Sequence, residues 1–472
     1  MRILEITLEN YEEKRNELIA ENSNLTGLVM RENEKRLAEV LEKLKEEYRE
    51  SCGGKIPYGM PVLTDKNLTS SRLYGFCSKM PKGADLHVHD MSLLPAKELV
   101  KLLLTKEEFF INADRKSYDL KVSKTDIPGY MKFCDAVNTG YYTEAEIIEN
   151  WTVAGAEKSK LGIWDYFEQL FERHAVLSSN PTFAAEYYDY TFRYYCKKNI
   201  QHVEIHLMLT DSIDESADYL KTVRQAYYNV KKDYPYFTLK IIGAGVKADS
   251  DNIDLTKKCF LNTSYVKEII KDESDSENPT DLVVGFDLVN EEDTSLPLHK
   301  FATMLLKVKK QYPDMKLYIH GGESLEATNE NLIDAYLLGV SRVGHGLNLY
   351  RYPDLHKRYV DAEICLEVCP ISNQTLGYTK DIRNHPATEY LRSGAALALC
   401  SDDPAYMENE TLTDDFFAAV VGWNLGLSDI KQLAINSIVY SAMTVKEKTK
   451  ALKAYNALWN KFIDEILTEY EN

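Results

Sequence analysis

The stretch Ala84-Asp85-Leu86-His87-Val88-His89 is typical of a short strand, and two of its last three residues are histidines. Strand side chains alternate between faces, so His87 and His89 point to the same side and can share one cation. Seven further short runs are rich in β-branched and apolar residues, and the eight runs are residues 84–89, 202–209, 238–246, 282–288, 316–320, 342–345, 363–369 and 395–401. Helical patterns separate most of them, for example at 217–232, 299–312, 330–338 and 384–393. Alternating strands and helices predict a parallel sheet of the α/β class, and eight such units close most economically as a (β/α)₈ TIM barrel.

Four polar clusters lie at the carboxyl ends of the first, fifth, sixth and eighth predicted strands. They are 87–89 (His-Val-His), 320–323 (His-Gly-Gly-Glu), 344–346 (Gly-His-Gly) and 401–404 (Ser-Asp-Asp-Pro). Barrel enzymes build their active sites at this face, so the motifs and the fold support each other. Taken singly, His345 could be a structural histidine, and Asp402 or Asp403 a helix N-cap. Together the clusters predict one metal site with its acid and base groups, because adjacent carboxylates at a strand end need a cation or a proton.

The composition restricts the partners that the chain can have. Its 472 residues carry a formal net charge of −18, which disfavours nucleic acid, since binding phosphates requires Lys and Arg. No apolar stretch approaches the roughly 20 residues that span a bilayer, and residues 1–10 lack the apolar core of a signal peptide. Eight cysteines are few for this length, and Cys365, Cys369 and Cys400 lie in apolar runs, as buried free thiols do. We expect a cytoplasmic protein with a small neutral substrate and no membrane or nucleic-acid partner.

Three regions lie outside the minimal barrel. Residues 1–75 form a helical extension, and residues 76–472 form the barrel domain, with an insertion at about 95–160 that is expected to overhang the site as a lid or substrate wall. Residues 429–470 are expected to form two closing helices. In the extension an apolar stripe follows helical spacing, namely Leu37, Val40, Leu41, Leu44 and Tyr48. Such a stripe packs either on the chain's own core or on an identical partner, and we expect a twofold dimer interface.

At these residues the chain resembles the adenosine deaminase family of zinc amidohydrolases, and most closely its growth factor group. The family pattern is H-x-H, H-x-G-E, G-H-G and a terminal D-D, and the matching stretches are 80–90, 284–289 with 291–294, 367–374, 381–386 and 401–404. The similarity covers nearly the whole chain, including the N-terminal helices that the group uses for dimerisation. It therefore implies a zinc-dependent homodimer that acts on a purine nucleoside.

The resemblance also implies a role for each cluster. It makes His87, His89, His320 and Asp402 the ligands of one Zn²⁺ per chain, with a water in the open position. His345 would orient that water and receive or stabilise its proton, and Asp402 would also accept a hydrogen bond from it. Glu323 would protonate the purine N1, so that the activated water attacks C6 and ammonia leaves. The implied catalytic residues are thus Glu323, His345 and Asp402.

Four residues match substrate contacts of the group. Asp403 would share a proton with the purine N7, and Asp90 would bind the ribose 5′-hydroxyl. Trp164 matches an aromatic wall of the pocket, although a core tryptophan has the same pattern. Asn290 replaces a family glycine whose backbone N–H meets purine N3, and asparagine tolerates left-handed backbone better than most residues.

Other positions do not determine which sugar the pocket binds. Residues 243–246 (Gly-Ala-Gly-Val) stand where the group carries a histidine near the ribose, and the signal peptide and paired cysteines of its secreted members are absent. Glu144 or Glu146 could bind ribose hydroxyls, although a solvated helix face is the better explanation of both. Lys82 and Lys247 could reach a phosphate.

The leading hypothesis is therefore hydrolytic deamination of adenosine and 2′-deoxyadenosine to inosine and 2′-deoxyinosine. The alternatives are deamination of another 6-substituted purine, such as adenine or a modified nucleoside or nucleotide, and a non-catalytic binding or signalling protein on the same fold.

Overall fold

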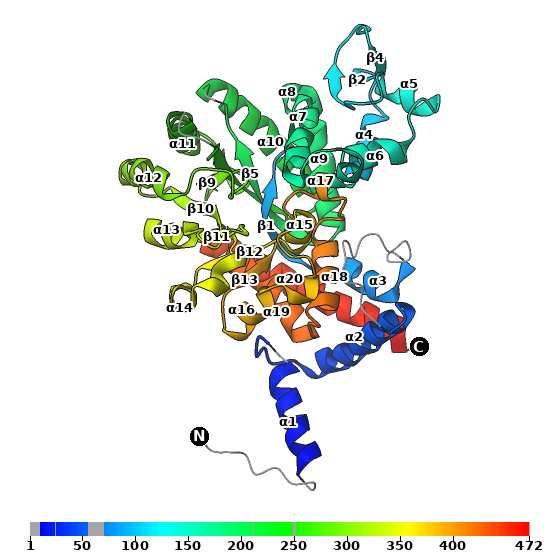
Figure 1. The fold of residues 1–472 in the computed structure, drawn as a ribbon, viewed down its shortest axis with the longest axis vertical. Helices are drawn as coiled ribbons and strands as arrows, with labels where there is room; N and C mark the ends of the chain where they lie inside the picture. The colour runs from blue at the N-terminus through cyan, green and yellow to red at the C-terminus, as the bar shows by residue number, and fades with distance from the viewer. Residues whose placement is uncertain (1–9, 24, 55–69, 211, 249–251, 472) are drawn as a thin grey trace.

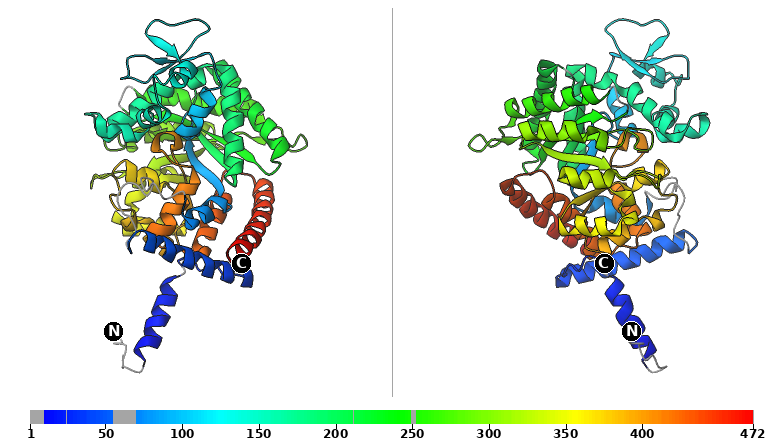
Figure 2. Two further views of the ribbon diagram at one scale, coloured as in Figure 1. Left: turned by 90° about the vertical axis from the view of Figure 1, so that its right-hand side faces the viewer. Right: turned by 60° about the vertical axis from the view of Figure 1, so that its left-hand side comes forward.

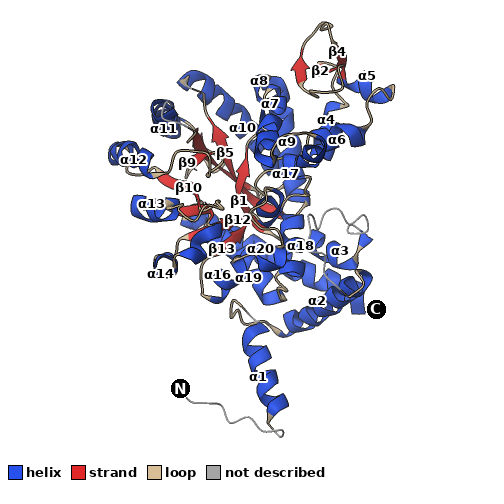
Figure 3. Ribbon diagram, in the orientation of Figure 1, coloured by secondary structure: helices blue, strands red, loops and turns tan. Residues whose placement is uncertain are grey.

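The computed structural model describes residues 10–23, 25–54, 70–210, 212–248 and 252–471, so nearly all of the segment considered for a signal peptide lies outside them. A parallel sheet of eight strands forms its centre, in the order β1-β5-β6-β9-β10-β11-β12-β13 (Figures 1 and 3). The strands are β1 (Gly83–His89), β5 (Ile200–Met208), β6 (Thr238–Val246), β9 (Val283–Val289), β10 (Lys316–Gly321), β11 (Arg342–His345), β12 (Cys365–Val368) and β13 (Leu397–Leu399). All eight predicted strands are confirmed.

The barrel closes between its first strand and the chain just after its last strand. An isolated parallel bridge joins Val88 to Asp402, and the backbone N–H of Asp402 donates to the carbonyl of His87 at 3.0 Å. The backbone N–H of His89 in turn donates to the carbonyl of Asp402 at 3.1 Å. Closure therefore places the first and last polar clusters side by side, as expected for a TIM barrel.

Helices surround the sheet and follow the strands in sequence (Figure 1). From β5 onward they are α10 (Ile213–Asp233), α11 (Asn252–Ile269), α12 (His299–Gln311), α13 (Asn331–Leu338), α14 (Pro353–Asp361), α15 (Pro370–Thr375), α16 (Ala387–Arg392), α17 (Pro404–Met407), α18 (Leu412–Gly422), α19 (Leu427–Val439) and α20 (Val445–Glu471), with the 3₁₀ turns η4 (Leu347–Arg351) and η5 (Ile382–Asn384). The pair β7 (Lys271–Asp272) and β8 (Thr280–Asp281) forms a separate short ladder. The two closing helices expected at 429–470 are present as α19 and α20. Among the helices of the described ranges, none has both the length and the apolar character that crossing a bilayer requires.

Two strands are shorter than the sequence predicts. The run 363–369 yields only β12, because Pro370 begins α15 and Glu363 has a left-handed φ of 52°. The run 395–401 yields only β13, which follows Gly394 with φ of 82°. At their carboxyl ends, Cys369 and residues 400–401, the backbone leaves the sheet next to the site residues Asp402 and Asp403.

Between β1 and β5 the chain makes a long excursion. Its elements are α4 (Ala96–Leu103), β2 (Phe109–Asn112), β3 (Leu120–Val122), β4 (Tyr130–Lys132), α5 (Phe133–Asn138), α6 (Glu144–Asn150), η3 (Val153–Lys158), α7 (Ile163–His174), α8 (Val176–Ser179) and α9 (Pro181–Lys197). The small antiparallel sheet β3-β2-β4 lies at the periphery of the molecule, at the upper right of Figure 1.

The N-terminal helices differ in how they pack. Helix α1 (Tyr11–Ser23) projects from the body, whereas α2 (Glu32–Ser51) lies along it (Figure 2). Helix α2 packs on α3 (Arg72–Lys79), α19 and α20, and Tyr48 meets Phe417 of α18 edge-on at 5.2 Å. All five stripe residues are buried within the single chain. The prediction that this stripe forms the twofold interface is therefore wrong, because the chain's own core already covers it.

Candidate active site

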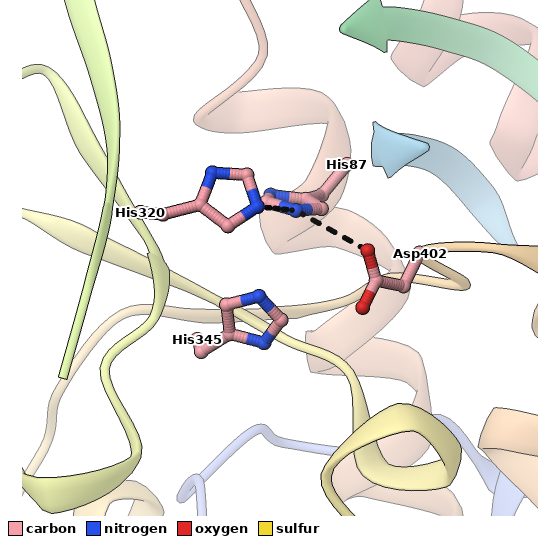
Figure 4. A group of neighbouring side chains, drawn as sticks. All are labelled: His87, His320, His345 and Asp402. Atoms are coloured by element: carbon pink, nitrogen blue, oxygen red, sulfur yellow. Dashed lines mark hydrogen bonds and ion pairs between the residues drawn. The ribbon is translucent and has the colours of Figure 1, made fainter. Parts of the chain in front are cut away.

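Four of the predicted site residues converge at the carboxyl ends of the strands (Figure 4). One donor atom each of His87, His320, His345 and Asp402 lies within 4.8 Å of the others, and all four side chains are buried. The Nε2 atoms of His87 and His320 are 3.0 Å apart, and Asp402 Oδ1 is 3.6 Å from His87 Nε2. The same Oδ1 is 3.2 Å from Nε2 of His89. The structure thus brings together the four proposed ligands and His345.

The donor set fits a metal ion. His87 directs Nδ1 at Glu367 Oε2, and His320 directs Nδ1 at Asp287 Oδ2, each at 2.7 Å. An imidazole that donates Nδ1–H to a carboxylate keeps a lone pair on Nε2, so the two Nε2 atoms would face each other at 3.0 Å as bare acceptors. A shared cation relieves that repulsion, and imidazole with carboxylate is a zinc-type set.

The pKa values of these histidines agree with that arrangement. Burial is the largest effect and lowers the pKa of His87, His320 and His345 to about 4, so all three are neutral at pH 7. Burial also disfavours the charged form of His89, but its interactions with Asp403 and Asp402 outweigh burial and raise its pKa to about 9. A cation in the cluster would compete with that proton.

Two further carboxyl groups hold protons in the pocket. Burial and the charge of Asp402 raise the pKa of Glu323 well above its usual range and that of Asp403 to about 8. Ser92 Oγ donates to Asp403 Oδ1 at 2.5 Å. The site therefore presents two neutral carboxylic acids beside one carboxylate at neutral pH.

Backbone strain gathers at the same place. His345 and Asp402 have φ of 62° and 59°, and Asn290 has φ of 115°. Non-glycine residues in this region are costly and mark functional segments. Asn290 thus has the kind of positive φ that asparagine tolerates better than most residues, and its side chain donates from Nδ2 to Ser295 Oγ at 3.1 Å.

A cavity of about 630 Å³ opens onto the cluster, within the size range of small-molecule sites. The four residues expected to contact substrate, Asp90, Trp164, Asn290 and Asp403, all line it. The other lining residues are His89, Met91, Phe167, Glu168, Phe171, Glu172, Ala175, His206, Met208, Ala244, Val246, Val289, His320, Glu323, His345, Leu376 and Asp402. Both oxygens of Asp90 are already hydrogen-bonded, one by the hydroxyl of Tyr188 and one by that of Tyr219.

Helix α7 supplies the wall that was expected from the insertion. Its residues Trp164, Phe167 and Phe171 line the cavity, whereas no residue between 95 and 160 does so. Glu146 on α6 instead pairs with Arg115 at 2.8 Å. The substrate wall therefore begins after the insertion, and neither Glu144 nor Glu146 lines the pocket.

The two lysines considered for phosphate binding do not line the cavity. Lys82 is buried at the start of β1, where its Nζ donates to the carbonyls of Ser78, Met80 and Lys198. Lys247 is also buried and is absent from the lining. The charged lining residues other than histidine are all acidic.

Several buried polar residues support the site, although sequence analysis predicts no role for them. Asp287 accepts from His320 and His206, and Glu367 joins His87 to Arg342. Glu292 accepts the backbone N–H groups of Gly322 and Glu323 at 3.0 and 2.9 Å and so holds the loop that carries the acid. These carboxylates lie in the stretches 284–289, 291–294 and 367–374, which match the family although they lie outside the four polar clusters. That match was the signal in the sequence that could have identified them.

Comparison with known proteins agrees with this geometry. The family model described as adenosine deaminase matches residues 154–456, which is more than half of the chain. The chain belongs to the adenosine deaminase family. Adenosine deaminase 2-A of Danio rerio is 30% identical over 96% of this chain and 94% of that protein. Adenosine deaminase 2 of Homo sapiens is 26% identical over 93% and 88% of the two chains.

Solved structures share the fold of this family member. An amidohydrolase from Burkholderia ambifaria with bound zinc has a TM-score of 0.60 and 16% identity, and the match covers 88% of this chain and 98% of that one. The N6-methyl-AMP deaminase of Arabidopsis thaliana has a TM-score of 0.58 and 15% identity over 81% and 98%. At these identities the likeness establishes the barrel architecture alone.

Proposed function

We propose that this enzyme deaminates adenosine and 2′-deoxyadenosine hydrolytically, giving inosine or 2′-deoxyinosine and ammonia. The observation that carries the proposal is the meeting of an imidazole–carboxylate cluster with two neutral carboxylic acids in one cavity. Hydrolytic deamination needs an activated water and a proton donor to the ring, and the cavity offers groups for both.

One zinc ion per chain is proposed at His87, His89, His320 and Asp402. When bound, zinc supplies a water whose pKa is lowered towards neutrality. A ring nitrogen of His345 also lies within 4.8 Å of the ligand atoms of His87, His320 and Asp402 (Figure 4). We propose that His345 orients the attacking oxygen and does not bind the metal.

The chain's own acids handle the purine. Glu323 is protonated at neutral pH and donates its proton to N1, which makes C6 electrophilic. Asp403 is proposed to donate a hydrogen bond to N7, which its raised pKa of about 8 permits. Asp402 keeps its negative charge, because the hydrogen bond with His89 and the interactions with the neighbouring histidines outweigh burial and lower its pKa.

The charge of the cavity favours a nucleoside over a nucleotide. Asp90, Glu168 and Glu172 line it, and no lysine or arginine does so among the described residues. A 5′-phosphate would meet like charge without a compensating donor. Asp90 is the residue proposed to accept the 5′-hydroxyl.

A substrate panel tests this assignment. Adenosine, 2′-deoxyadenosine, adenine, AMP and N6-methyl-AMP are followed by loss of absorbance at the adenosine band. We expect kcat/KM for adenosine to exceed that for AMP by about tenfold or more, and Asp90→Ala to narrow the ratio chiefly by losing adenosine activity. A higher kcat/KM for AMP or for adenine would overturn the nucleoside assignment.

We also propose a homodimer, through α1 instead of the α2 stripe. A helix of 13 residues is marginal in water by itself, and α1 exposes Tyr11, Leu18 and Ile19 while it projects from the body (Figure 2). Light scattering of the full chain should give twice the chain mass, and deletion of residues 1–23 should give a monomer. A monomeric full chain would refute the dimer.

A further inference from the structure

A buried asparagine lies between the two groups that handle protons. Asn373 is fully buried in α15, and its Nδ2 is 3.3 Å from Glu323 Oε1 and 3.2 Å from His345 Nδ1. Glu323 Oε1 and His345 Nδ1 are themselves 3.4 Å apart. One amide group thus touches both residues at once.

The orientation of the Asn373 amide follows from the backbone N–H of Ala387, because a backbone N–H can only donate a hydrogen bond. The backbone N–H of Ala387 donates to His385 Nδ1 at 3.1 Å, so this nitrogen is an acceptor and the neutral ring carries its proton on Nε2. His385 Nε2 lies 3.2 Å from Asn373 Oδ1 and must donate to it. The NH₂ group of Asn373 is then the end that faces Glu323 and His345.

An NH₂ group can only donate hydrogen bonds, so the two atoms that it contacts on His345 and Glu323 must be acceptors. His345 Nδ1 must accept, so the neutral ring carries its proton on Nε2. Glu323 Oε1 must accept as well, which favours the proton of the neutral acid on Oε2. In Figure 4 the other ring nitrogen of His345 points towards His87 and His320.

We propose that Asn373, oriented by His385, is a positioning residue that sets the proton on Nε2 of His345 and on Oε2 of Glu323. This inference rests on the proposed deaminase function and adds the placement of its protons. His345 then presents an N–H to the attacking oxygen and orients it as a donor, while Glu323 keeps Oε2–H for the purine.

The surroundings of His385 support its part in this chain. The ring is buried and packs against Trp423 with centroids 5.0 Å apart. Burial lowers the pKa of His385 to about 3, so it stays neutral and its single N–H keeps one direction.

Kinetics of the zinc-loaded protein test the positioning role. We expect Asn373→Ala to lower kcat on adenosine by about tenfold or more with little change in KM, while zinc stays at one per chain. His385→Ala should lower kcat less, and the double variant should be no worse than Asn373→Ala alone, because His385 acts through Asn373. Ser372→Ala is the matched control, since the neighbouring Ser372 is equally buried and its Oγ has no hydrogen-bond partner in the part of the chain that the structure describes. The proposal would be overturned if the kcat losses of the two single variants multiplied in the double variant. It would also be overturned if Asn373→Ala lost no more kcat than Ser372→Ala.

A second measurement does not depend on turnover. Nitrogen-15 NMR of histidine-labelled, zinc-loaded protein, with His345 assigned by His345→Asn, reports which ring nitrogen carries the proton. We expect the Nε2–H tautomer in the wild type and a mixture of tautomers in Asn373→Ala. A wild-type ring protonated on Nδ1 would overturn the inference even if adenosine is the substrate. If no purine is turned over, the proposed function fails, but this measurement still decides where the proton lies.

Discussion

Glu323 and Asp402 are both buried in one cavity, yet their pKa values shift in opposite directions. Burial raises both, and the difference comes from their neighbours: Glu323 faces the charge of Asp402, whereas Asp402 is hydrogen-bonded to His89. Because their pKa values differ in this way, Glu323 can act as a proton donor while Asp402 stays an anion.

A substitution that removes the acidic proton of Glu323 but keeps the shape of its side chain should slow the reaction without affecting the fold or the metal content. We expect Glu323→Gln to lower kcat by about 10²- to 10⁴-fold while the fold and one zinc per chain are retained. Glu326→Gln, three residues further along and exposed, is the control and should leave kcat unchanged. Near-normal turnover by Glu323→Gln would assign the acid role to another group.

Glu367 is predicted to act through a metal ligand. Its Oε2 lies 2.7 Å from His87 Nδ1, and Arg342 pairs with its other oxygen. Glu367→Gln should therefore weaken zinc binding by about 10- to 100-fold, measured by competition with a chelator. Glu363→Gln, exposed just before the same strand, should bind zinc as the wild type does. Equal affinity of both variants would contradict the orienting role.

Among the elements, the eight strands were predictable because each is a short apolar run between helical patterns. The four clusters at their ends were predictable for the same reason, since each follows such a run. The role of Glu367 was not, because its partner His87 is 280 positions away and meets it only when the barrel closes. The wall formed by α7 and the packing of α2 likewise depend on tertiary contacts that periodicity does not encode.

Helix α2 provides a test of the corrected packing. Leu41 is fully buried against the body of its own chain, so Leu41→Ala should lower the free energy of unfolding by about 3 kcal/mol without changing the mass in solution. Lys43→Ala, on the exposed face of α2, should leave both unchanged. If Leu41→Ala changed the oligomeric state but not the free energy of unfolding, the stripe would be the dimer interface after all.

At the scale of the whole molecule, the fold and the site depend on the same closure. The bridge between Val88 and Asp402 joins the two ends of the sheet and sets a proposed ligand beside His87 and His89. The acidic lining of the cavity has the same sign as the net charge of −18, and both disfavour an anionic substrate.

The most direct test of the central claim is a zinc titration of chelator-treated protein, with adenosine deamination followed at each addition. We expect no turnover without metal and a linear rise in the deamination rate that ends at one zinc per chain. Full activity of the metal-free protein, or no adenosine turnover at any zinc level, would contradict it.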